Sequence, residues 1–177
     1  MTTVFIGGSR HLSRLSAEVC QRIDRIIENK FPIIVGDANG IDKAVQQYLL
    51  SKLYPLVEVF CSGGKCRNNL GDWPVRSIQT YRQRKDFNFY AAKDRQMAID
   101  ASSGLMIWDG KSKGTLLNVV RLLRQQKTVE MYEAPANRFW TLRSQDDWLQ
   151  FVDRDPALKL LIEQEEVVAS NKETTAA

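Results

Sequence analysis

The sequence predicts an α/β fold, in which a single Rossmann-like parallel sheet carries helices on both faces and a helical extension follows at the C-terminus. Short apolar runs alternate with helical patterns along the chain, and glycines and polar residues follow the apolar runs. This alternation is typical of parallel strands joined by right-handed crossovers. The 177 residues are enough to bury one substantial core.

Five apolar runs predict strands, and four longer patterns predict helices. The strands are expected at residues 3–6, 32–35, 56–61, 105–108 and 128–132. The helices are expected at residues 16–29, 40–53, 87–101 and 115–125, with Ser16 as the N-cap of the first. Residues 62–83 are rich in glycine and are expected to form a long irregular loop, which is uncommon unless it is functional or mobile.

The chain is expected to be one domain with a short addition. Residues 1–134 are predicted to form the Rossmann-like domain, residues 135–170 its helical extension, and residues 171–177 a disordered tail. Within the extension, apolar residues predict a short amphipathic helix at Trp148, Leu149 and Phe151, and Asp155-Pro156 predicts the start of another. The apolar residues that follow could pack on the chain's own sheet or on a second copy of it: Leu158, Leu161 and Ile162.

The composition narrows the classes of function. Three cysteines, without a Cys-x-x-Cys pair, predict free thiols in a cytosolic protein, although the spacing of Cys61 and Cys66 could close a disulfide. The single histidine, His11, leads us to expect no structural metal. No apolar run reaches the length of a membrane span and no basic signal segment opens the sequence, so a cytoplasmic protein without a membrane partner is expected.

The positive charge is concentrated in the middle of the chain. The net charge is +4, and eight basic residues lie between Lys65 and Arg95 against three acidic ones. Such a segment suits phosphate groups, whether of a nucleotide or of a nucleic acid backbone. A solvated surface loop is the alternative interpretation.

Three loops follow predicted strands, and in parallel sheets ligands bind beyond the carboxyl ends of the strands. The loops are residues 7–10, 36–42 and 109–115. In the third, glycines allow close backbone approach, lysines add positive charge and the following helix offers its N-terminal N–H groups, which together predict a phosphate pocket. An ordinary turn capped by Ser112 is the alternative.

Residues of these loops are the candidates for ligand contacts. Arg10 and Lys93 suit phosphate because each lies beside a predicted loop, although Lys93 and Asp94 could instead form an exposed ion pair. Asp109 could bind a base or a ribose, act as an acid, or order the loop around Lys111. The candidates are Gly7, Gly8, Ser9, Arg10, Gly36, Asp37, Ala38, Gly40, Asp42, Lys93, Asp109, Gly110, Lys111, Ser112, Gly114 and Thr115.

Four segments together resemble the SMF/DprA–LOG superfamily, or SLOG, of Rossmann-like nucleotide-binding domains. They are Gly7-Gly8-Ser9-Arg10, residues 36–42, Lys93-Asp94-Arg95-Gln96-Met97 and residues 109–115. The resemblance covers roughly residues 3–132. It implies that the chain binds a nucleotide or a nucleotide-derived ligand, the only cofactor we expect. It also implies that Asp42 fixes its loop or reaches a ribose hydroxyl; the alternative is that Asp42 only caps its helix. The resemblance further favours a homodimer.

The sequence departs from the pattern of one branch of this superfamily. LOG proteins, which are phosphoribohydrolases, carry a Pro-Gly-Gly-x-Gly-Thr-x-x-Glu signature, whereas this chain reads Gly114-Thr115-Leu116-Leu117-Asn118 and lacks the leading proline. The amide of Asn118 can hydrogen-bond a ribose, but it cannot perform the chemistry of a carboxylate. Asn118 is therefore expected to contact the ligand, and binding of a nucleotide-type ligand, in sensing or processing, is the function that we predict.

Two alternatives remain open. The first is a nucleoside 5′-phosphate N-glycosidase, a hydrolase in which Asp109 or Asp94 replaces the missing glutamate. The second is DprA-like binding of nucleic acid, for which the basic middle carries interleaved aromatic residues, as stacking on bases requires, unless these residues belong to the core. Those aromatic residues are Tyr81, Phe87, Phe89 and Tyr90.

Overall fold

The computed structural model describes residues 2–79, 87–156 and 158–159, which form one seven-stranded sheet in the order β4-β3-β2-β1-β5-β6-β7. The strands are β1 (Val4–Gly8), β2 (Ile33–Gly36), β3 (Val57–Ser62), β4 (Val75–Ile78), β5 (Ser103–Trp108), β6 (Thr128–Glu133) and β7 (Arg138–Leu142). The helices are α1 (Ala17–Glu28), α2 (Ile41–Ser51), α3 (Phe87–Asp100), α4 (Lys113–Leu123) and α5 (Gln145–Asp153). The α/β fold with a mostly parallel sheet is confirmed.

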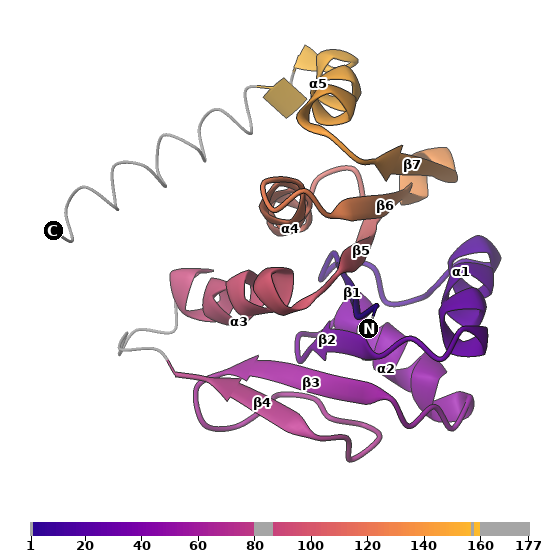
Figure 1. Cartoon of the computed structure of the whole chain (residues 1–177), viewed down its shortest axis with the longest axis vertical. Coiled ribbons are helices and arrows are strands. Elements are labelled where there is room, and N and C mark those ends of the chain that lie inside the picture. Colours follow the sequence, from indigo (N-terminus) through magenta and orange to yellow (C-terminus); the bar gives the residue numbers. More distant parts are fainter. Residues whose placement is uncertain (1, 80–86, 157, 160–177) are drawn as a thin grey trace, which may run out of the picture.

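The helices cover both faces of the sheet (Figure 1). Val4 and Ile6 of β1 pack with the apolar stripes of α1 and α2, which include Val19, Ile23 and Val45. Phe5, between them in the strand, belongs to the opposite core with residues of α3, α4 and α5. Side chains alternate between the two faces of a strand, so the continuous apolar run of β1 fills both cores. Ser16 caps α1 as predicted, accepting the backbone N–H of Val19 at 3.3 Å.

Two strands were not predicted. Residues 62–83 were expected to be irregular, but the sheet is extended there by β4, an edge strand of four residues that lies half exposed. Residues 135–170 were expected to be helical, but β7 pairs antiparallel with β6 in that segment, after one turn of 3₁₀ helix at Ala134–Ala136. Both strands are short and carry exposed polar residues, so neither shows the apolar run of a buried strand.

The C-terminal apolar residues pack on the chain's own core. The predicted amphipathic helix is present as α5, and Trp148 and Phe151 are buried in the same core as α4. Leu158 joins this core, and the backbone is helical at Pro156 and at residues 158–159. Trp148, Phe151 and Leu158 thus pack on the chain's own core, whereas Leu149 is 48 % exposed. Leu161, Ile162 and residues 171–177 lie outside the described residues.

The order of the strands places a switch point between β1 and β5. From β1 the chain builds β2, β3 and β4 on one side, and then crosses over to lay β5 beside β1 on the other. The loops that leave β1 and β5 therefore lead to helices on opposite faces, and a crevice opens between them at the carboxyl edge. Among the described residues, no helix is both long and apolar enough to cross a bilayer, and Cys20, Cys61 and Cys66 are free thiols, as predicted.

Candidate ligand-binding site

A cavity of about 670 Å³ lies at the switch point, among the loops that leave β1 and β5, the middle of α3 and the first turns of α4. Its lining is mixed, with apolar walls and several charged side chains. The lining residues are Phe5, Gly7, Gly8, Arg10, His11, Ala38, Asp42, Tyr90, Ala91, Lys93, Asp94, Met97, Asp109, Lys111, Ser112, Lys113, Gly114, Thr115 and Asn118.

Most of the candidates from the sequence lie on this cavity, but five do not: Ser9, Gly36, Asp37, Gly40 and Gly110. Gly110 turns away toward Pro135, at a second hollow on the far side of its loop. Gly40 holds a positive φ of 83° against the backbone of Arg10, where a side chain would collide. These five residues do not line the cavity.

Ser9 ties three loops together. It is fully buried, and its backbone N–H donates to Ile107 O at 3.0 Å while its carbonyl accepts the N–H of Ile41 at 3.0 Å. Its hydroxyl donates to Asp109 Oδ2 at 2.7 Å and accepts the N–H of His11. These bonds hold the ends of β1 and β5 and the start of α2 in fixed positions around the cavity.

The β5–α4 loop is ordered by its own side chains. Asp109 Oδ1 accepts the backbone N–H groups of Lys111 (3.0 Å) and Ser112 (2.7 Å). Burial raises the pKa of Asp109, but the hydrogen bonds from Ser9 and from these two N–H groups outweigh it, so the pKa lies below its ordinary value. Ser112 caps α4, with Oγ accepting the N–H of Thr115. Asp109 thus orders the loop, one of the three roles considered for it.

The first turn of α4 borders the cavity. Its first N–H groups have no acceptor within the helix and give this end a partial positive charge. Gly114 lies in this turn, and a Cβ added there would meet no atom within 4 Å, so the turn is open to the cavity. The turn is therefore capped by Ser112, as one interpretation of the sequence expected, and it is also accessible to a ligand, as a phosphate pocket requires.

Lys93 lies at the back of the cavity between two carboxylates. Its Nζ is 2.8 Å from Asp94 Oδ1 and 3.6 Å from Asp42 Oδ2, and the side chain is only 4 % exposed. Asp42 also accepts the N–H of Ala38 at 3.1 Å, which fixes the loop that follows β2. The alternative of an exposed Lys93–Asp94 pair is therefore wrong, because α3 buries this lysine against Gly36 of β2.

Burial and charge act against each other in this cluster. Burial raises the pKa of Asp42, and Lys93 only partly opposes it. Burial alone would lower the pKa of Lys93, but the carboxylates of Asp94 and Asp42 raise it. Burial likewise would raise the pKa of Asp94, but Lys93 lowers it. The ammonium of Lys93 is thus balanced within the protein.

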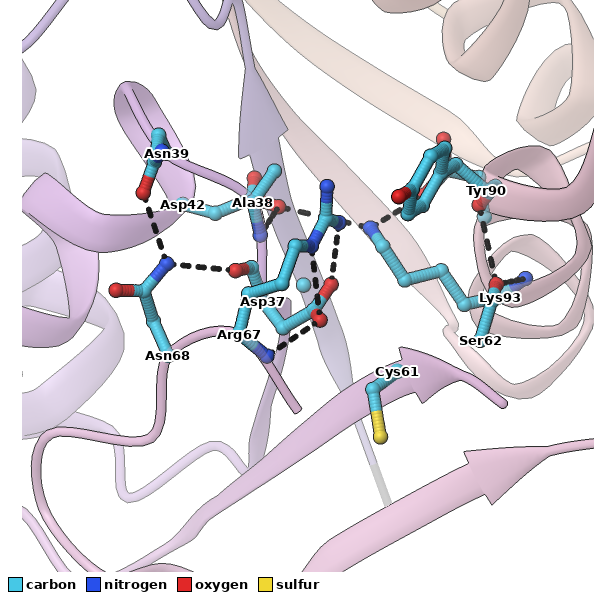
Figure 2. A network of polar contacts seen from close by, with 12 residues as sticks. Asp37, Ala38, Asn39, Asp42, Cys61, Ser62, Arg67, Asn68, Tyr90 and Lys93 are labelled. Atoms are coloured by element: carbon cyan, nitrogen blue, oxygen red, sulfur yellow. Dashed lines mark hydrogen bonds and ion pairs between the residues drawn. The ribbon is translucent and has the colours of Figure 1, made fainter. Parts of the chain in front are cut away.

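A second ion pair stands beside the cavity (Figure 2). Asp37, which is only 3 % exposed, accepts the backbone N–H of Arg67 at 3.0 Å, its Nε at 3.1 Å and its Nη2 at 2.6 Å. Burial would raise the pKa of Asp37, but Arg67 lowers it. The Arg67 guanidinium also lies over the ring of Tyr90, 4.4 Å from its centroid. Asp37 therefore has a structural partner, which the sequence did not identify.

The lining residues that the list of candidates did not contain come mainly from α3, and they include Tyr90, Ala91 and Met97 beside the predicted Lys93. Tyr90, Lys93 and Met97 follow one another at spacings of three and four, so they share one face of α3 and line the cavity together. That spacing is a signal which the sequence did contain. On α4, Asn118 lines the cavity and its Oδ1 accepts Arg121 Nη1 at 2.6 Å. Within the described residues, no group of three or more His, Cys, Asp or Glu side chains could hold a metal ion.

Comparison with known proteins adds a likeness of fold. No family model and no curated protein matches this chain. The structure of DNA processing protein A from Helicobacter pylori, described for its unique single-stranded DNA binding mode, aligns with a TM-score of 0.56 and 18 % identity over 73 % of this chain and 64 % of that one. DprA from Streptococcus pneumoniae aligns with a TM-score of 0.53 and 18 % identity over 73 % of this chain and 50 % of that one.

These alignments concern the fold alone. The chain spans 64 % and 50 % of the length of the two DprA chains it matches. DprA proteins belong to the superfamily that the four sequence segments resemble, so the likeness agrees with that resemblance at the level of the Rossmann-like sheet.

Proposed function

We propose that the cavity binds the phosphate of a nucleotide-type ligand. The observation that carries this proposal is the first turn of α4, which is open to a cavity whose lining also holds Arg10 and Lys111. A helix N-terminus offers N–H groups and a favourable dipole to an anion, and neighbouring cations strengthen the site. The volume of about 670 Å³ lies within the usual range for small-molecule sites, which supports a ligand of nucleotide size.

The basic residues around the cavity have different roles, because they differ in whether a carboxylate neutralises them. Lys93 is balanced by Asp94 and Asp42, so its charge is already compensated within the fold. Arg10 and Lys111 line the cavity from the loops that leave β1 and β5, and we assign the phosphate contact to them. Lys93 then acts by holding Asp42, and through it the β2–α2 loop, in position.

The contacts of the carboxylates favour binding over hydrolysis. Asp109 uses both oxygens to order its own loop, and Asp94 is held by Lys93. The amide oxygen of Asn118 accepts a hydrogen bond from Arg121. Each of these groups is thus engaged by the protein, so we infer a binding role and not an N-glycosidase.

Single-stranded DNA is the second candidate ligand. The Helicobacter pylori protein, which shares the fold, is described for its single-stranded DNA binding mode. In this chain Tyr90 lies on the cavity with the guanidinium of Arg10 5.4 Å from its ring centroid, and such aromatic and basic surfaces suit single strands. The phosphate site proposed above would then hold one nucleotide unit of the strand.

Calorimetric titration with three ligands tests both candidates: a nucleoside, its 5′-monophosphate and an oligothymidylate. If the phosphate site is real, the monophosphate binds more tightly than the nucleoside. Arg10→Ala and Lys111→Ala then each weaken it by about 10- to 100-fold, the usual value of a charged hydrogen bond. Arg25→Ala, which removes the same charge from the exposed face of α1, leaves binding unchanged.

The ligands also separate the two candidates. Tighter binding of the oligonucleotide than of the monophosphate, with an affinity that falls steeply with salt, identifies single-stranded DNA as the ligand. Equal affinity for nucleoside and monophosphate would refute the phosphate site, as would an equal loss of affinity in Arg25→Ala and Lys111→Ala.

A further inference from the structure

Tyr90 is the aromatic side chain that combines access to the cavity with a fixed support. It is half-buried and lines the cavity, whereas Phe89 and Trp108 are buried in the structure. Two guanidinium groups lie over its ring, Arg67 at 4.4 Å and Arg10 at 5.4 Å from the centroid. Arg10 lines the cavity and Arg67 does not, so the two cations differ in their access to a ligand.

Arg67 is held too firmly to be a ligand contact itself. Three of its N–H groups donate to the buried carboxylate of Asp37, including its own backbone N–H. Asn68, the next residue, donates to the carbonyl of Asp37 at 2.8 Å and to Asn39 Oδ1 at 3.1 Å. Figure 2 shows this network between the β2–α2 loop and Arg67 with Asn68, and the guanidinium of Arg67 lies over the ring of Tyr90. A guanidinium fixed in this way orients the ring that stacks on it.

The backbone of α3 is anchored beside the same ring. The hydroxyl of Ser62, at the end of β3, donates to the carbonyl of Tyr90 at 3.3 Å and accepts the N–H of Lys93 at 3.3 Å. Phe89 meets Tyr90 edge to face, with ring centroids 5.2 Å apart. The ring is therefore positioned from β3, from the β2–α2 loop and from its own helix, as a preorganised surface should be.

We propose that Tyr90 is the stacking platform for the planar ring of the ligand, and so determines that the site takes a nucleobase rather than any sugar phosphate. The base lies against the Tyr90 ring in the place that Arg10 now holds, and the guanidinium of Arg10 turns to the phosphate. Arg67, supported by Asp37, stays in place and keeps the ring oriented. This inference rests on the proposed phosphate site, because it supplies the other half of the same ligand.

The chemistry explains why a tyrosine suits this position. A nucleobase offers a flat π-face of the size of an aromatic side chain, and stacking is tolerant of which base is present. Arg10 already lies over this ring without an ion pair to a carboxylate among the described residues, whereas the guanidinium of Arg67 would have to break two hydrogen bonds to Asp37 to move. Exchange of Arg10 for a base is therefore the easier change.

The test compares Tyr90→Leu and Tyr90→Phe in the full chain, with calorimetric titration of adenosine 5′-monophosphate, ribose 5-phosphate and an oligothymidylate. Tyr90→Leu removes the aromatic face and is expected to weaken the monophosphate by about tenfold or more. Ribose 5-phosphate, which has no base, binds the variant as it binds the wild type. Tyr90→Phe keeps the face and retains the affinity of the wild type for all three ligands.

Each other result has a defined meaning. A loss of affinity in Tyr90→Leu for the oligonucleotide but not for the monophosphate also supports stacking, and it identifies a strand as the source of the base. Equal losses for ribose 5-phosphate and the monophosphate would mean that the variant has lost the pocket and not the platform, which overturns the inference. So would a Tyr90→Phe variant as weak as Tyr90→Leu, because the hydroxyl would then be the contact. If none of the ligands binds the wild type, the phosphate site itself is refuted.

Discussion

The two sides of the cavity are built in different ways. The β5–α4 loop, residues 109–115, is ordered mainly by contacts within itself, such as those of Asp109 with N–H groups two and three residues ahead. The opposite side is an ion-pair layer made of Asp37, Asp42, Arg67, Lys93 and Asp94. Its contacts join the β2–α2 loop, α2, the segment after β3 and α3, with Asp37 and Arg67 thirty residues apart.

The difference determines how each side responds to change. A loop held by local hydrogen bonds loses one bond at a time, and water can replace the lost partner because the loop is partly exposed. A buried charge has no such substitute, so removal of one partner leaves the other desolvated and unpaired. Substitutions in the ion-pair layer should therefore cause the largest loss in the free energy of unfolding. Substitutions in the loop should cause the largest loss of affinity for the ligand.

The largest effect is expected for Asp37→Ala. The substitution takes away the acceptor of three hydrogen bonds from Arg67. We expect a loss of about 3 kcal/mol in the free energy of unfolding, near the lower end for buried pairs. The value is at this end because the Arg67 side chain is 31 % exposed. Urea unfolding followed by circular dichroism measures this loss.

The matched control is Glu58→Ala on the far side of β3. Glu58 accepts Arg76 Nε at 3.1 Å, but this carboxylate is 31 % exposed, against 3 % for Asp37. Arg76 also keeps a second partner in Asp100. The loss should be below about 1 kcal/mol, as for exposed pairs generally. Similar losses in the two variants would show that burial does not distinguish the ion-pair layer.

The next effect compares a glycine from each side. A Cβ at Gly36 would collide with the carboxylate of Asp42 and the ammonium of Lys93, so Gly36→Ala is expected to destabilise the fold by about 1–3 kcal/mol. A Cβ at Gly114 meets nothing within 4 Å. Because this residue lies in the first turn of α4, Gly114→Ala is expected to stabilise the fold by up to about 1 kcal/mol. Thermal unfolding of both variants measures the contrast, and a destabilised Gly114→Ala would refute it.

The two sides of the cavity also differ in how much of each could be predicted from the sequence. The β5–α4 loop was predicted, together with its capping serine, because Asp109, Ser112 and Thr115 act on neighbours in the chain. The partners of the ion-pair layer were not. Nothing in the sequence links Asp37 to Arg67, since the pairing exists only once β2, β3 and the segment after β3 have come together. The same holds for Ser9, because its bonds to Ile107, Ile41 and Asp109 form only in the fold, and the sequence showed no more than its position in a loop after a strand.

The fold was predicted where the sequence carried buried apolar runs. The five predicted strands are all present, because each carries a run of buried apolar residues, although β3 and β6 also contain the partly exposed Glu58 and Glu130. The short strands β4 and β7 lie at the two edges of the sheet, where one side of each strand has no neighbour among the described strands. All their residues except the buried Leu142 are exposed or half-buried, so their composition resembles that of a loop.

The smallest effect is expected in the pH dependence of stability for Asp109→Asn. This variant keeps the shape of the side chain and removes its charge. The pKa of this carboxyl is lowered in the folded protein, so its contribution to stability is present above the unfolded pKa of about 3.9 and is lost as the pH falls through the folded value. Asp109→Asn should therefore be less stable than the wild type at neutral pH. The two should become more alike as the pH falls below about 4.

Ser112→Ala provides the comparison within the same loop, because it removes the cap of α4 without removing a titrating group. Its deficit of about 1 kcal/mol, the usual value of an N-cap, should stay constant as the pH falls. Urea unfolding of the three proteins between neutral pH and about pH 3 measures both differences. A deficit of Asp109→Asn that does not change with pH would mean that the loop needs the shape of the side chain and not its charge. The β5–α4 loop would then depend on packing, as the rest of the sheet edge does, and its electrostatic distinction from the ion-pair layer would disappear.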